Sequence, residues 1–223
     1  MNTRNEASTS SAGTTVRYLH SYDSSSRWKD FNACGQAAVA TLLDYHDRNP
    51  FGLEKSIYDP RDGRHHWEND AIIDRIKAEF PPDYFGGLFG TTPGRIAEAL
   101  TAAGLRATAS WSRDPAEGLR MWREAKEWLS AGFPVIAVVD QGKLGGRPFA
   151  AHWAVVYQVA DSVARLACTK NVAAVSEDQF LTAFACRFMP PPFNHATVLC
   201  HPADGVGTTP SSSMGSVNRH RGA

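Results

Sequence analysis

The feature that most constrains this chain is a change in hydrophobic period at Gly132. Before Gly132, apolar residues recur every three to four positions, as in amphipathic helices, and after it short runs rich in valine and alanine follow. Helices are therefore predicted over residues 34–46, 69–80, 92–104 and 115–131. Helices followed by strands that can pair with their neighbours in sequence are typical of an α+β domain. The expected fold packs a mainly helical N-terminal part on a C-terminal antiparallel sheet.

Residues that begin or end helices mark the predicted boundaries. Thr92 can cap a helix that has Pro93 in its first turn, and Gly104 ends that helix. The helix over 34–46 carries apolar residues on most of its faces, so it is expected to be buried. The stretch 49–67 is predicted to be a long polar loop, a length that indicates function or mobility.

The second half of the chain contains the predicted strands. Residues 134–140 read as a buried strand followed by a glycine-rich loop, and a last strand is expected over 196–200. Residues 152–159 and 163–169 are predicted to form a hairpin around a two-residue turn, Asp161 and Ser162. A short helix over 176–184 begins with Ser176 and Gln179 in the positions of a capping box.

Composition limits the classes of protein to which the chain can belong. The 23 basic and 23 acidic residues cancel, which argues against nucleic acid and a membrane surface as partners. The longest apolar runs fall short of the roughly 20 residues that span a bilayer. Residues 1–15 and 203–223 are polar and predicted to be disordered tails, which leaves one domain over 16–202.

Cysteine usage and the polar N-terminus bear on location. Four cysteines without a CxxC pair do not build a disulfide scaffold or a zinc ribbon. Residues 1–15 lack the apolar segment of a secretory signal, so the expected location is the cytoplasm. Export without a cleaved signal peptide, as for an effector, is the alternative.

Cys34 is the candidate nucleophile. It stands at the start of the predicted buried helix, where unpaired backbone N–H groups and the helix dipole favour an anion. We expect a lowered pKa for its thiol, which would make it a better nucleophile at neutral pH. Gly35 is expected to keep the approach to the sulfur open, and the neighbouring amides are expected to stabilise an oxyanion.

His152 is the candidate base, because it opens a strand directly after a flexible loop. If Asp161 and Ser162 form a two-residue turn, paired positions sum to 323 and Asn171 faces His152. Opposed side chains in such a pair have Cβ atoms about 4.5–5.5 Å apart, so Asn171 would orient the imidazole. A turn one residue longer would pair His152 with Lys170 or Val172 instead.

These residues resemble a known family. The stretch from Cys34 to Ala40 (CGQAAVA), followed by Leu42, Leu43, Tyr45 and His46, is similar to the nucleophile helix of peptidase C39-like cysteine proteases. The resemblance continues through residues 90–105 (GTTPGRIAEALTAAGL), 128–140 (WLSAGFPVIAVVD) and 152–159 (HWAVVYQV), and covers about residues 31–200. It implies a papain-like cysteine protease fold and a catalytic triad of Cys34, His152 and Asn171.

The chain departs from the family pattern at two places. Where the family has a Gln that completes the oxyanion hole, six residues before the Cys, this chain has Trp28. Asn32 is the candidate substitute, with a helix-entry cap as the plainer reading. After the His strand, the family commonly has an Asp or Asn that is followed by Pro or Gly. In this chain the corresponding segment contains Lys170 and Asn171, and Asn171 is followed by Val172.

Several residues have plainer readings. Cys168, Cys186 and Cys200 lie in apolar segments and are expected to be buried as small apolar core residues. A loop that holds Asp62, His65, His66 and Glu68 lacks the ordered spacing of a metal site, so a solvated loop is favoured and no metal or other cofactor is predicted. Trp28 and Trp153 fall beside the predicted site, where they are expected to line a substrate groove.

The sequence thus predicts a cysteine peptidase that cleaves a peptide or amide bond through a Cys34 acyl-enzyme. Its partner would be a peptide or protein substrate. Two alternatives stay open: an acyltransferase or transglutaminase-like enzyme with the same Cys–His site, and a catalytically silent binding domain of the same fold.

Overall fold

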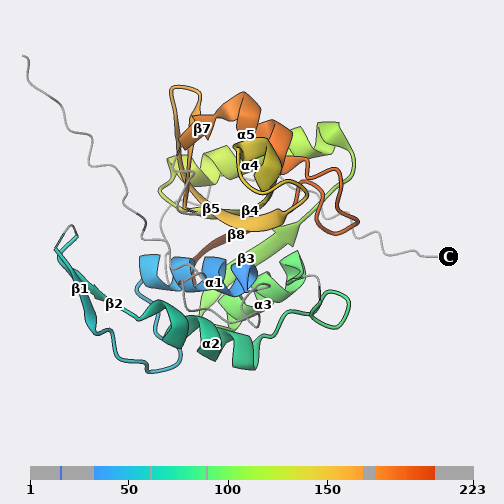
Figure 1. Ribbon diagram of the computed structural model, residues 1–223. Coiled ribbons are helices and arrows are strands. Elements are labelled where there is room, and N and C mark those ends of the chain that lie inside the picture. Colours follow the sequence, from blue (N-terminus) through green and yellow to red (C-terminus); the bar gives the residue numbers. More distant parts are fainter. Residues whose placement is uncertain (1–15, 17–32, 61, 89, 168–173, 204–223) are drawn as a thin grey trace, which may run out of the picture.

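The structure is a computed structural model that describes residue 16 and residues 33–60, 62–88, 90–167 and 174–203. A six-stranded sheet lies at its centre, with helices packed against both faces (Figure 1). Of the predicted tails, 1–15 and 203–223, all but residue 203 lie outside the described residues.

The sheet is antiparallel throughout and is built from residues 105–202. Its strand order is β3-β8-β4-β5-β6-β7. The strands are β3 (Leu105–Ser110), β4 (Val135–Asp140), β5 (Ala151–Ala160), β6 (Val163–Ala167), β7 (Ala174–Ser176) and β8 (Thr197–Pro202). The α+β class predicted from the sequence is confirmed.

Helices lie on both sides of the sheet: on one side two pack against the strands and a third packs on the first of these, and on the other side two pack against the strands. The first set is α1 (Cys34–Tyr45), α2 (Asn69–Glu79) and α3 (Pro93–Ala102), and the second is α4 (Pro115–Ser130) and α5 (Glu177–Phe184) (Figure 1). All of α1 from Gly35 to Asp44 is buried, as its all-round apolar sequence predicts. The caps predicted at Thr92 and Ser176 are confirmed, since both side chains accept a backbone N–H of the first turn.

Side chains alternate between the two faces along the central strands. On β5, Trp153 and Val155 join the core cluster that contains α1, whereas Ala154 and Val156 join the cluster of α4 and α5. On β4, Ile136 and Val138 belong to the first cluster and its other valines to the second. Both strands are therefore buried on both faces, which explains their nearly continuous apolar sequence.

The stretch 49–67 differs from the predicted polar loop. It holds a two-stranded hairpin, β1 (Ile57–Asp59) and β2 (Arg64–His66), that ends in the fully buried Trp67. Three further elements, β3, β7 and the short 3₁₀ helix η2 (Gln141–Leu144), were not predicted from the sequence. Leu119 of the helix over 115–130 is 50% exposed.

The hairpin of β5 and β6 has the predicted two-residue turn. Asp161 and Ser162 both have positive φ, and Ala160 pairs with Val163. A bulge between Val156 and Gln158 then shifts the register by one residue. Pairs beyond the bulge sum to 322 (Val156 with Leu166) instead of 323, so the arithmetic that placed Asn171 opposite His152 does not hold.

The helices of the described residues include none that combines the length and the apolar character needed to cross a bilayer.

Candidate active site

Cys34 is the first residue of α1, and the start of this helix lacks a side-chain cap. The residue before it, Ala33, has no side chain that can accept a hydrogen bond. The backbone N–H groups of Cys34 and Gly35 instead form hydrogen bonds to the Cys34 sulfur. The local sequence therefore leaves the first turn of the helix free to stabilise negative charge on this atom.

A third backbone N–H reaches the sulfur from the sheet. It belongs to Trp153 in β5, directly after His152. The sulfur thus lies beside the peptide that joins these two residues, so the fold brings the backbone at His152 next to Cys34, which is far away in the sequence. His152 is 3% exposed and pairs with Val139 of β4. The catalytic roles of Cys34 and His152 stay predictions.

The pKa of the Cys34 thiol is raised, not lowered as the sequence predicted. Burial is the largest influence and raises this pKa, while the N–H groups of Trp153, Gly35 and Cys34 itself act in the opposite direction. Cys34 as a whole is half-buried, but its sulfur atom is surrounded by protein. The resting group is therefore a neutral thiol that needs a base to become a nucleophile.

Gly35 is needed for packing. A Cβ atom at this position would lie 2.7 Å from the Cβ of Thr91, inside van der Waals contact. Gly35 is itself buried, so the expected role of keeping the approach to the sulfur open gives way to close contact between α1 and the segment before α3.

A buried Gln36, which the sequence interpretation missed, connects that segment to the site. Its Nε2 donates to the Phe80 carbonyl over 2.9 Å, and its Oε1 accepts from the Thr91 hydroxyl over 3.2 Å. The Thr91 carbonyl in turn accepts the Trp153 indole N–H over 2.9 Å. These bonds fix β5 against the first turn of α1. A polar residue among the alanines and glycine of the first turns was the one available signal.

Trp153 does not line a groove. Its side chain is 2% exposed and packs in the core near Phe193, so the expectation of a substrate-lining role is wrong. Its contributions are the backbone N–H at the sulfur and the indole bond to Thr91. The other predicted site residues, Trp28, Asn32 and Asn171, lie outside the described residues.

Two of the remaining cysteines are buried, as predicted. Burial is the main cause that raises the pKa of Cys186 and of Cys200 to about 12 in each case. Neither is poised for nucleophilic chemistry. Cys168 lies outside the described residues.

A group of potential metal ligands lies in the β1–β2 hairpin. Oxygen atoms of Asp59 and Asp62 and a ring nitrogen of His66 lie within 4.8 Å of one another, while His65 and Glu68 take no part. The His66 ring already contacts carboxylates through both nitrogens: Nδ1 contacts Asp44 at 2.5 Å, and Nε2 contacts Asp62 at 3.0 Å. These contacts satisfy the ring without a metal, and they form a polar network that is buried at His66 and exposed at Asp62.

Comparisons with known proteins find structural likeness only. No family model matches the chain, and no curated protein matches it. The structure is similar to the peptidase domain of Streptococcus ComA, a bifunctional ABC transporter involved in quorum sensing (TM-score 0.46, 16% identity, 77% of this chain and 92% of that one).

Two further solved structures are similar. One is a double-glycine-motif protease from an AMS/PCAT transporter in complex with its leader peptide (TM-score 0.44, 15% identity, 76% of this chain and 84% of that one). The other is described as a C39-like peptidase from Bacillus anthracis (TM-score 0.49, 10% identity, 76% and 88%). Because all three TM-scores lie below 0.5, we base the function on the geometry of this chain.

Proposed function

We propose that this protein is a papain-like, C39-like cysteine peptidase with Cys34 as nucleophile and His152 as general base. One observation carries the proposal. The Cys34 sulfur lies at the start of a buried helix, receives three backbone N–H groups, and sits against the peptide between His152 and Trp153. A sulfur in such surroundings can carry the negative charge that a nucleophile needs.

The acylation step begins with the neutral thiol. His152 takes the thiol proton, and the resulting thiolate attacks the carbonyl carbon of a peptide bond. The N–H groups at the start of α1 stabilise the oxyanion of the tetrahedral intermediate. When the intermediate collapses, the protonated His152 gives its proton to the leaving amine, which leaves a thioester on Cys34.

Deacylation reverses these roles. Neutral His152 takes a proton from water, the hydroxide attacks the thioester carbonyl, and the carboxylic acid leaves as the thiol is reprotonated. An amine in place of water would give acyl transfer from the same intermediate. Asn171 is the proposed third member of the triad, and this assignment rests only on the resemblance to the C39-like family.

One observation favours a second candidate, a binding domain that keeps the fold without turnover. Burial holds the pKa of Cys34 above its usual value, so most of the resting protein carries a weakly nucleophilic thiol. The two candidates differ in whether His152 can remove the thiol proton when a substrate binds.

Labelling with a panel of peptide vinyl sulfones tests the peptidase. We expect one adduct per chain, on Cys34, by intact-mass and peptide mass spectrometry, and none on Cys34→Ala. His152→Ala should slow labelling about a hundredfold or more, the usual contribution of a general base. With iodoacetamide and no peptide, the pH midpoint of Cys34 alkylation should lie above that of an ordinary thiol, because its pKa is raised.

Cys200→Ala provides the matched control, because this cysteine is fully buried and belongs to the α1 core cluster. Its labelling rate should equal that of the wild type. Equal labelling rates for the wild type and His152→Ala, together with no cleavage of a peptide library by the wild type, would support the binding domain and refute the peptidase.

A further inference from the structure

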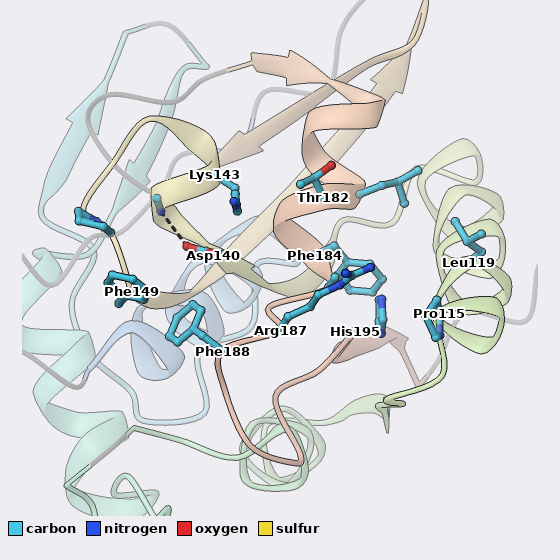
Figure 2. A pocket seen from close by; sticks show the side chains of 15 residues that line it. Pro115, Leu119, Asp140, Lys143, Phe149, Thr182, Phe184, Arg187, Phe188 and His195 are labelled. Carbon is cyan, nitrogen blue, oxygen red and sulfur yellow. Dashed lines mark hydrogen bonds between the residues drawn. The ribbon is translucent and has the colours of Figure 1, made fainter.

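A cavity of about 730 Å³ lies on the α4 and α5 side of the sheet. It is bordered by the start of α4, by α5, by the end of β4 and by the loop that follows η2 (Figure 2). Neither Cys34 nor His152 lines it. A volume of this size is in the range of about 300–1,000 Å³ that small-molecule sites occupy.

The walls of the cavity carry apolar side chains that the fold leaves in contact with water. Phe149 is 84% exposed, Leu119 is 50% exposed and Phe188 is 36% exposed. The rings of Phe149 and Phe188 meet edge to face, with centroids 6.1 Å apart. Exposed large apolar residues that gather at one cavity indicate a binding site more often than scattered ones do.

Left-handed backbone conformations occur in the cavity lining and directly beside it. Phe149, Cys186 and His195 have φ values of 53°, 41° and 44°, in the left-handed region that side chains rarely adopt. Gly118 of α4 lies so close to His195 that a Cβ atom would come within 2.4 Å of the ring. The Nδ1 of His195 donates to the Ser112 carbonyl over 2.8 Å, which fixes the ring beside the cavity.

The charged groups at the rim are mainly positive. Lys143 and Arg187 border the cavity together with one carboxylate, Asp140 (Figure 2). Asp140 already accepts the backbone N–H of Gly142 over 2.9 Å. No ion pair involves Lys143 or Arg187 within the part of the chain that the structure describes. Two cations without ion-pair partners beside an apolar wall complement a ligand that is apolar along its body and anionic at one end.

We propose that this cavity binds an apolar carboxylate, such as a medium-length fatty acid or an aromatic acid. The apolar body lies against Leu119, Phe149 and Phe188, and the carboxylate lies between Lys143 and Arg187. This site is separate from the proposed thiol chemistry and does not depend on it.

Isothermal titration calorimetry with decanoate, decanol and decyltrimethylammonium tests the proposal on the full chain. Decanoate should bind about tenfold more tightly than decanol, since two rim charges contribute modestly each, and more tightly still than the cation. The double change Lys143→Gln and Arg187→Gln should reduce decanoate binding to the level of decanol. Phe149→Ser should weaken the binding of decanoate and decanol alike.

Arg165→Gln is the matched control, because it removes an exposed cation on β6 that does not line the cavity. Its decanoate affinity should equal that of the wild type. Absence of decanoate binding, equal affinity for decanol and decanoate, or an equal loss in Arg165→Gln would each overturn the proposal. Cys34→Ala should bind decanoate normally, so a failure of the peptidase function would not be mistaken for a failure of this site.

Discussion

Gly35 is the residue on which the contact between α1 and the Thr91 segment depends. An added methyl group would lie 2.7 Å from the Thr91 Cβ, and Thr91 holds the Trp153 indole. We expect Gly35→Ala to lower the free energy of unfolding by about 1–3 kcal/mol, as overpacking of a core does. It should also slow vinyl sulfone labelling of Cys34, because the Trp153 peptide moves with Thr91. Urea denaturation and labelling kinetics measure the two effects.

Gly94→Ala is a close control for this prediction. Gly94 is likewise the second residue of its helix, α3, but no atom of the described residues outside its own stretch of helix lies within 4 Å of the position that its Cβ would take. Alanine there should leave labelling unchanged and stabilise the protein by up to about 1 kcal/mol. Similar effects of the two substitutions would show that the Thr91 contact does not position the site.

The sequence suggests candidate residues for the site, but it did not predict the surroundings of Cys34. Cys34 and His152 follow from local signals, a helix start and a strand start. The direction of the Cys34 pKa does not, because the burial that raises it arises from tertiary packing and not from the neighbouring residues of the sequence. The hydrogen bonds of Gln36 could not be predicted either, because its partners, Phe80 and Thr91, lie on other segments of the chain.

At the scale of elements, the β1–β2 hairpin is attached to α1 through a buried carboxylate. Asp44 of α1 is 2% exposed, and its Oδ2 contacts Nδ1 of His66, whose other nitrogen contacts Asp62. Both ring nitrogens therefore face carboxylate oxygens. Removal of one partner from a buried pair leaves the other uncompensated, so Asp44→Asn should cost about 3 kcal/mol or more.

Thermal unfolding measures this cost, and hydrogen exchange shows where it arises. The amides of the hairpin, from Ile57 to His66, should lose protection first in Asp44→Asn. Glu117→Gln, in an exposed i,i+3 pair with Arg120, should cost less than about 1 kcal/mol. An Asp44→Asn effect as small as the Glu117→Gln effect would mean that the hairpin is held by Trp67 and its apolar neighbours instead.

Helices whose ends are marked by capping residues in the sequence were predicted well. Elements that depend on distant partners were not. Thr92 and Ser176 cap their helices as expected because a cap involves only the next three residues. In β3 only Leu105 is fully buried, so its sequence has no apolar run, and pairing with β8 defines it. The bulge in β5 adds one residue within an unbroken apolar stretch, and hydrophobic alternation cannot reveal it.

At the scale of the whole molecule, a titratable group lies where the end of α1 meets the segment between α4 and β4. His46 follows the last residue of α1 and lies beside Phe133, which leads from α4 into β4. Burial, followed by the charges of Arg48 and His201, lowers the pKa of His46 to about 4. Its Nε2 is buried and has no hydrogen-bond partner in the described part of the chain. Protonation at this junction therefore opposes the packing of α1 against the rest of the fold.

The sign of the pH effect follows from this lowered pKa. Between pH 6.5 and about 4 the unfolded chain binds a proton at His46 and the folded chain does not, so stability falls as the pH falls. The loss can reach about 3 kcal/mol below pH 4. His46→Gln should abolish this part of the slope in urea denaturations at pH 7 and pH 4.5. His65→Gln, at an exposed position on β2, should retain it. Parallel pH profiles for wild type and His46→Gln would place the acid sensitivity of the fold elsewhere.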